Sequence, residues 1–129
     1  VLSAATSLSY SGRSWDDGAL VELADILPEC LSLEDLDLSE NPVGDAGVQA
    51  CIERCRPLAK LGLANTGITD SSLASAAKAF TGLRHVVGNG TQVGDVSVRA
   101  LAENCPSLEF AVFSDTKTSD DAVGLLARA

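Results

Sequence analysis

The chain has 129 residues, about one domain's worth, and its apolar fraction of 46% is too high for a disordered polypeptide. It carries 18 acidic and 9 basic residues, a formal net charge of −9, which argues against nucleic acid as a partner because phosphate backbones need clustered Lys and Arg. No apolar run approaches the roughly 18 residues that span a bilayer, so direct membrane insertion is not expected.

The negative charge is concentrated at the start of the chain. Residues 1–50 hold ten acids and a single base, Arg13, whereas residues 51–129 hold eight of each. All of the net charge therefore comes from the first two fifths of the sequence, and this asymmetry requires either a structural explanation or a partner with a basic segment.

The sequence repeats itself with a period of 25 residues. The segment 31–41 reads LSLEDLDLSEN, with the pattern L-x-x-L-x-L-x-x-N, and the same apolar positions recur after 25, 50 and 75 residues. An aspartate follows with the same period, at Asp45, Asp70, Asp95 and Asp120. An earlier and longer unit fits with a spacing of 28. The chain is therefore predicted to be a single domain, residues 1–129, with repeats that start near residues 5, 33, 58, 83 and 108.

Each repeat predicts one short strand and one helix. Alternating apolar residues indicate strands near 7–10, 35–38, 60–63, 85–88 and 110–113. Apolar residues at helical spacing indicate helices over about 18–27, 46–55, 71–80, 96–104 and 120–127. The repeated aspartates stand at the helix starts, where they can accept hydrogen bonds from free backbone N–H groups. Gly88 occupies a position that Leu38 and Leu63 fill in other repeats, so a pinched or water-filled strand is expected there.

These repeats resemble the leucine-rich repeat family. The segment LEDLDLSENPVGDAGVQA is similar to the ribonuclease-inhibitor type of repeat, while CIERCRPLAKLGLANTGITDSSLASAA and LAENCPSLEF are similar to the cysteine-containing type of F-box substrate adaptors. The resemblance implies an α/β solenoid with short parallel strands on the concave face and helices on the convex face. Since repeats bury their apolar faces only by stacking, the ends are expected to be covered by neighbouring chains or further sequence.

The four cysteines are interpreted as core residues. Cys30, Cys55 and Cys105 share one column of the repeat, and Phe80 fills its fourth place, which is typical of packing. Cys51 lies in a second apolar column. A disulfide between Cys30 and Cys55 remains the alternative. Unpaired cysteines indicate a reducing, intracellular compartment, and no metal or cofactor is expected.

The solvent-facing strand positions are the candidate partner-binding residues. The predicted concave surface changes from acidic to basic to apolar along the chain. The alternative is that these residues form an ordinary solvated surface that binds no partner. Its residues are Glu34, Asp35 and Asp37 with Glu40 in the following turn, then Lys60, Arg84 and His85, then Phe110 and Val112.

No nucleophile–base pair, carboxylate pair or metal cluster recurs at a set position in the repeat, so an enzyme is not expected. The sequence favours a non-enzymatic protein–protein interaction module, a scaffold or accessory subunit of a larger assembly. The alternative, which the resemblance implies, is the substrate-recognition domain of an F-box-type ubiquitin ligase adaptor.

Overall fold

A computed structural model describes residues 4–119, in which short strands and helices alternate along the chain. The strands are β1 (Ser7–Ser9), β2 (Asp35–Asp37), β3 (Lys60–Gly62), β4 (His85–Val87) and β5 (Phe110–Val112). The α-helices are α1 (Asp17–Ile26), α2 (Asp45–Arg54), α3 (Asp70–Ala79) and α4 (Asp95–Asn104), and the short 3-10 helix η2 (Leu27–Glu29) follows α1. These bounds agree with the predicted ones to within one residue. The predicted helix over 120–127 lies outside the described residues.

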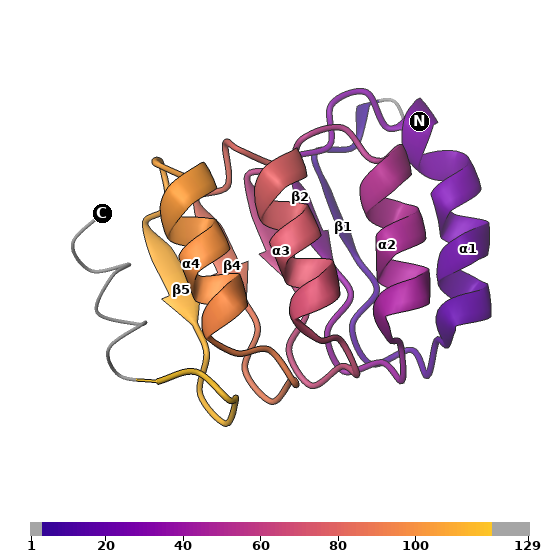
Figure 1. Ribbon diagram of the computed structural model, residues 1–129. Helices are drawn as coiled ribbons and strands as arrows, with labels where there is room; N and C mark the ends of the chain where they lie inside the picture. Colours follow the sequence, from indigo (N-terminus) through magenta and orange to yellow (C-terminus); the bar gives the residue numbers. More distant parts are fainter. Residues whose placement is uncertain (1–3, 120–129) are drawn as a thin grey trace.

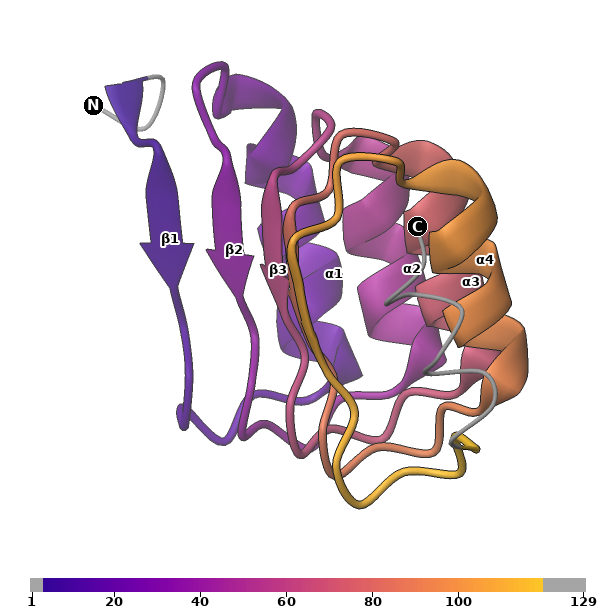
Figure 2. The same cartoon turned by 90° about the vertical axis from the view of Figure 1, so that its left-hand side faces the viewer.

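The strands form one parallel sheet in the order β1-β2-β3-β4-β5, and the α-helices lie side by side along one face of it (Figure 1). The view turned by 90° shows the two layers separately, with strands on one side and helices on the other (Figure 2). Leu36 pairs with Leu61, and Leu61 with Val86, so the 25-residue period becomes the register of the sheet. Leu8 pairs with Leu36, which confirms the 28-residue spacing of the first repeat.

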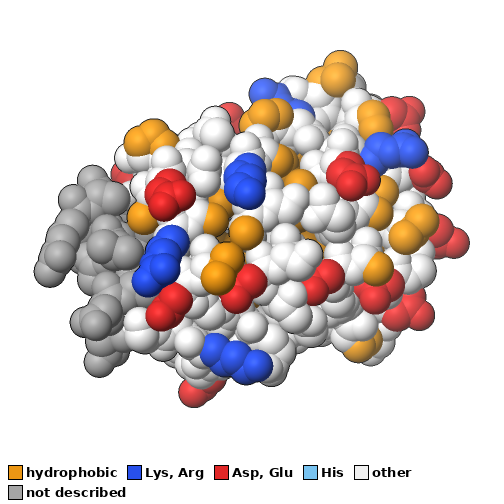
Figure 3. Space-filling view, in the orientation of Figure 1, with side chains coloured by type: hydrophobic (Ala, Val, Ile, Leu, Met, Phe, Trp, Pro, Cys, Tyr) orange, Lys and Arg blue, Asp and Glu red, His pale blue; other side chains and the backbone are white. Residues whose placement is uncertain are grey.

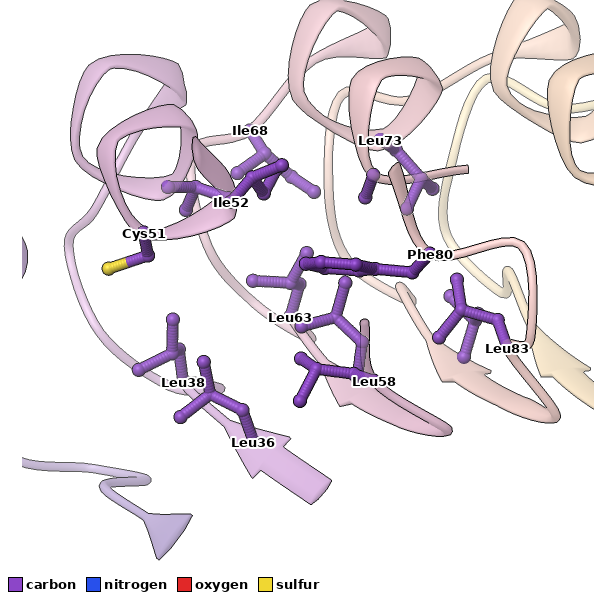
Figure 4. Packing of buried hydrophobic residues seen from close by; sticks show 14 of the residues in the cluster. Leu36, Leu38, Cys51, Ile52, Leu58, Leu63, Ile68, Leu73, Phe80 and Leu83 are labelled. Atoms are coloured by element: carbon purple, nitrogen blue, oxygen red, sulfur yellow. The ribbon is translucent and has the colours of Figure 1, made fainter. Parts of the chain in front are cut away.

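The core lies between the sheet and the helices (Figure 4). Leu61 is only 3% exposed, and Phe80, which takes the cysteine position in its repeat, is among the largest fully buried side chains. Because every repeat contributes the same few apolar columns, each side chain packs mainly against its equivalents in the neighbouring repeats.

The expectation of a pinched or water-filled repeat at Gly88 is wrong. The next residue in that column is Phe113, and a Cβ added to Gly88 would lie 3.2 Å from an edge carbon of its ring. The larger ring therefore occupies the space that a leucine at position 88 would fill. Strand β4 keeps its regular pairing on both sides, and Val86 stays fully buried.

The repeated aspartates cap a different helix from the one predicted. Asp17, at the start of α1, accepts hydrogen bonds from the backbone N–H groups of Gly44 (2.8 Å) and Gly47 (3.0 Å), at the start of α2. Asp17, Asp45 and Asp70 thus each bind the helix start of the following repeat, and Asp95 binds the equivalent position, Ser119. The same pattern continues from Asp45 to Thr69 and Ser72, from Asp70 to Gly94 and Ser97, and from Asp95 to Ser119. We call these four residues the aspartate ladder.

Hydrogen bonding keeps one member of the ladder ionised. Partial burial of Asp45 opposes its charge, but hydrogen bonds from Ser72 and Thr69 outweigh this and lower its pKa. Asp45 is therefore a charged acceptor, which binds N–H groups more strongly than a neutral one does.

Replacing Leu61 with alanine should lower the free energy of unfolding by about 2–5 kcal/mol, because it empties a buried position between two repeats. Urea denaturation followed by circular dichroism measures the change. An unchanged midpoint would contradict the register described here.

Asp45→Ala should lower the free energy of unfolding by about 1–3 kcal/mol, because the Thr69 N–H and the fully buried Ser72 hydroxyl lose their acceptor. The exposed residue Asp25 provides the control, and Asp25→Ala should cost much less. Since the pKa of Asp45 is lower in the folded than in the unfolded chain, its stabilisation is present above about pH 4 and is lost as the pH falls. The difference in the free energy of unfolding between wild type and Asp45→Ala, measured by urea denaturation, should therefore become smaller towards pH 3.

Candidate functional site

The sheet face opposite the helices carries a groove of about 360 Å³. Strands β1 to β4 all contribute to it, so its long direction runs across the strands. Because side chains alternate along a strand, the residues beside the buried Leu36 and Leu61 point to this face. The lining residues are Ser7, Ser9, Asp35, Asp37, Ser39, Lys60, Leu61, Gly62, His85 and Val87.

The strand register arranges the outer residues of this face in two rows. The first row runs Ser7, Asp35, Lys60, His85, Phe110, and the second row runs Ser9, Asp37, Gly62, Val87, Val112. Carboxylates therefore lie on β2, cationic and aromatic groups follow in the first row, and valines follow in the second. The predicted change from acidic through basic to apolar exists in space as well as in sequence.

Asp37 is held in place by the loop that follows its own strand. Its Oδ1 accepts a hydrogen bond of 3.0 Å from the backbone N–H of Ser39. The Ser39 hydroxyl in turn accepts one of 3.0 Å from the N–H of Ala64, in the next repeat. Gly62, the neighbour of Asp37 in the second row, leaves the space for this arrangement, since a Cβ there would lie 2.5 Å from Asp37 Oδ1. The carboxylate is therefore oriented before any ligand arrives.

Lys60 stands beside Asp35 in the first row, on the neighbouring strand. Within residues 4–119 the ion pairs join Arg54 to Asp25 and Arg84 to Glu109, so neither groove residue takes part in one. Both charges of the first row thus remain available to a partner.

Five of the predicted partner-binding residues lie outside the groove lining, and three of these, Glu34, Glu40 and Arg84, also lie outside the strands. Arg84 donates from its Nε to Glu109, and this hydrogen bond lowers the pKa of Glu109. Glu40 lies in the loop after β2, in the left-handed region (φ 61°), and accepts a hydrogen bond from Asn65 at 2.6 Å. Glu34 precedes β2 and is exposed.

The remaining predicted residues lie on the strands as expected. Asp35, Asp37, Lys60 and His85 line the groove together. Phe110 and Val112 continue the two rows on β5, beyond the groove. The Phe110 ring is 44% exposed and lies 5.8 Å from that of His85, centroid to centroid.

Besides the buried Leu61, five lining residues do not belong to the predicted partner-binding set: Ser7, Ser9, Ser39, Gly62 and Val87. The 28-residue spacing of the first repeat was enough to place Ser7 and Ser9 beside Asp35 and Asp37. The roles of Ser39 and Gly62 depend on side-chain geometry, which the repeat pattern does not give.

The helix side of the molecule differs from the groove. Figure 3 shows acidic and basic side chains mixed over the helices, with acidic ones most numerous over α1. None of the helices in the described part of the chain is long and apolar enough to cross a membrane.

The four cysteines are free thiols packed in or against the core. Cys30, Cys51 and Cys105 are buried, and Cys55 is half-buried. Burial, reinforced by the neighbouring Cys55, raises the pKa of Cys51 to about 12, and burial with the nearby Cys30 raises that of Cys55 to about 11. Such thiols stay protonated at neutral pH and are poor nucleophiles and metal ligands. Among the described residues, no group of three or more His, Cys, Asp or Glu could hold a metal ion.

Comparison with known proteins gives related repeats. Residues 29–50 match the family described as Leucine Rich repeat. The chain is 36% identical over 89 residues to NACHT, LRR and PYD domains-containing protein 3 of Macaca mulatta and of Rattus norvegicus, and 35% identical to that of Homo sapiens. Each alignment covers 64% of this chain and 9% of the relative, so the chain matches a short stretch of much longer proteins.

Among solved structures, Leiomodin-1 Actin-Binding Site 2 (ABS2) has a similar fold. The TM-score is 0.70, and the match covers 95% of this chain and 75% of the other. Since the two sequences are only 13% identical, the likeness is one of fold alone.

Iodoacetamide should label Cys55 of the native protein at pH 8 more than tenfold more slowly than that of the urea-unfolded chain, because the raised pKa keeps the thiol protonated. Mass spectrometry of the labelled peptides measures the rates, with Cys55→Ser to confirm the assignment. Equal labelling rates in the two states would show that the Cys55 thiol is not shielded and that its pKa is not raised.

Proposed function

Since the chain belongs to the leucine-rich repeat family, we propose that it is a protein-binding module whose concave groove receives a basic segment of a partner. The observation that carries this proposal is the groove itself, in which Asp35 and Asp37 project from one strand. We further propose that the module serves as a scaffold or accessory subunit of a larger assembly.

Electrostatics support a basic partner. The two carboxylates belong to the part of the chain that carries the whole net charge. Acidic side chains on a rigid sheet attract a basic partner over several ångströms and so speed its approach. Lys60, on the next strand, limits how far along the groove a basic segment can extend.

Binding without catalysis fits both the family and the site. Leucine-rich repeat domains are typically non-catalytic. His85, which lines the groove, lies beside the Phe110 ring, and within residues 4–119 its imidazole makes no hydrogen bond to an acid or a nucleophile.

A ubiquitin ligase adaptor is the second candidate. The cysteine column at Cys30, Cys55 and Cys105, which is similar to that of F-box adaptors, favours it. Under this reading, the same groove would hold the substrate to be modified. An adaptor should co-purify with a ligase core, whereas a subunit of another assembly should co-purify with that assembly.

We also propose an intracellular, reducing compartment for the chain. Its support is that all four cysteines are free and none of them needs a disulfide to pack. Cells lysed directly into a denaturant that contains a maleimide test this. Free thiols are labelled, whereas a disulfide would protect a pair of them.

The test of the proposed function compares partner capture by wild type, by Asp35→Asn/Asp37→Asn and by a control, Glu22→Gln/Glu53→Gln. The control removes the same charge from the helix side, where both glutamates are exposed. Affinity purification with mass spectrometry should show a partner that the groove variant loses and the control retains.

With that partner purified, the groove variant should associate about threefold to tenfold more slowly at low ionic strength, because electrostatic attraction speeds the encounter. The difference should shrink at high salt, where the charges are screened. Equal association rates for wild type and groove variant at low salt would mean that the acidic residues only keep the surface solvated.

A further inference from the structure

The two ends of the groove differ in chemistry, which restricts the ligand more closely than its charge alone. We propose that the groove binds an extended peptide in which one Arg or Lys contacts Asp37 and an apolar side chain, two positions away, contacts Val87 and, just beyond the groove, Val112. This inference rests on the proposed function and specifies the segment that the partner contributes.

Asp37 is the anchor for the basic residue. Its Oδ1 accepts from the Ser39 N–H, and Oδ2 has no hydrogen-bond partner within residues 4–119, so Oδ2 is available to a ligand. Its neighbours in the second row are Ser9 and Gly62, and neither carries a charge. Within the described residues no Lys or Arg side chain neutralises Asp37. A guanidinium or ammonium group can therefore reach a preoriented carboxylate, with the Ser9 hydroxyl beside it as a further acceptor.

Lys60 places the basic residue of the ligand in the second row. It is paired with Asp35 in the strand register of the first row, and no ion pair within the described residues neutralises it. A ligand cation over the first row would meet this like charge, so Asp37 in the second row is the better acceptor. The peptide's own backbone carbonyls are suitable acceptors for the three ammonium protons of Lys60.

Gly62 brings the Asp37 carboxylate towards the apolar end of the row. Position 62 has no side chain, and the carboxylate fills this space, since a Cβ there would lie 2.5 Å from Asp37 Oδ1. The acceptor therefore stands over β3, one strand nearer to Val87 than its own strand is.

The far end of the row is apolar. Val87 and Val112 are neighbours in the register, and both are half-buried. The exposed Phe110 ring borders them in the first row and packs against His85, which restricts its movement. A leucine, isoleucine or valine of the ligand would lose water-exposed surface on these side chains.

The spacing follows from the geometry of strands. Neighbouring strands lie about 4.8 Å apart, so Val87 is about 5 Å and Val112 about 10 Å from the carboxylate over Gly62. An extended peptide rises about 3.3 Å per residue and turns alternate side chains to the same side. Residues two positions apart share a side and stand about 7 Å apart, which lies between these two distances. Residues four apart, at about 13 Å, reach beyond Val112, and residues three apart point in opposite directions.

Synthetic decapeptides of Ser and Gly, each with one Arg and one Leu at a separation of two, three or four, test the proposal. The Leu is placed after the Arg in one set and before it in the other, since the direction of the chain is open. Fluorescence polarisation should show that a peptide with a separation of two binds at least tenfold more tightly than the others in its set. Its Arg→Gln and Leu→Ser versions should bind at least tenfold more weakly.

Paired variants of the protein assign the two contacts. Asp37→Asn retains the acceptor for the Ser39 N–H and should abolish the preference for Arg over Gln, while Asp25→Asn, on the exposed face of α1, should preserve it. Val112→Thr should abolish the preference for Leu over Ser, and Val96→Thr, at an exposed position of α4, should not. Circular dichroism verifies that each variant is folded.

The outcomes separate this inference from the proposed function. Binding that does not depend on the separation, or no binding by any peptide at millimolar concentration, overturns the inference. If the groove variant Asp35→Asn/Asp37→Asn nevertheless loses a captured protein, the proposed function stands and only the peptide motif is wrong. If that variant captures the same proteins as wild type, the proposed function fails as well.

Discussion

The aspartate ladder is the interaction on which the alignment of the repeats depends. The first N–H groups of a helix have no partner within the helix, and neither α2 nor α4 receives a side-chain cap from its own N-cap residue, since both begin after glycine. The caps come instead from Asp17 and Asp70, one repeat earlier. A slip of one repeat against the next would leave both a charged carboxylate and several N–H groups without partners. The ladder therefore sets the stacking of helices, and with it the register of the strands.

The groove is a consequence of that register. Its rows exist only because equivalent residues of successive repeats stand side by side, so that Asp37, Gly62 and Val87 become neighbours although 25 residues separate each from the next. Hydrogen bonds between repeats also hold its edge, as the one from the Ala64 N–H to the Ser39 hydroxyl shows. A binding surface built from short strands in this way is rigid, and a rigid surface loses little entropy when it binds a ligand.

The first repeat, which is three residues longer, is joined to the second by one asparagine. The Asn41 side chain accepts hydrogen bonds from the N–H groups of Arg13 and Trp15 and donates to the carbonyl of Tyr10. It is only 2% exposed, so these bonds are shielded from water. Later repeats have threonine at this position, and Thr66 donates only to the carbonyl of Leu63 within its own repeat. The irregular first unit thus needs a stronger link, and its β1 can then supply Ser7 and Ser9 to the groove.

The sequence by itself determined the period, the strands, the helices and the face on which each side chain lies, because these features depend on residues close together in the chain. Asp35, Asp37, Lys60 and His85 could therefore be assigned to one surface from alternation alone. The tertiary structure decided which helix each aspartate caps, that Glu109 pairs with Arg84, and that Phe113 fills the space beside Gly88. Each of these contacts joins residues about 25 apart, and its geometry depends on how closely one repeat lies on the next. The distance between neighbouring repeats results from packing across the whole stack, which the sequence of a single repeat does not determine.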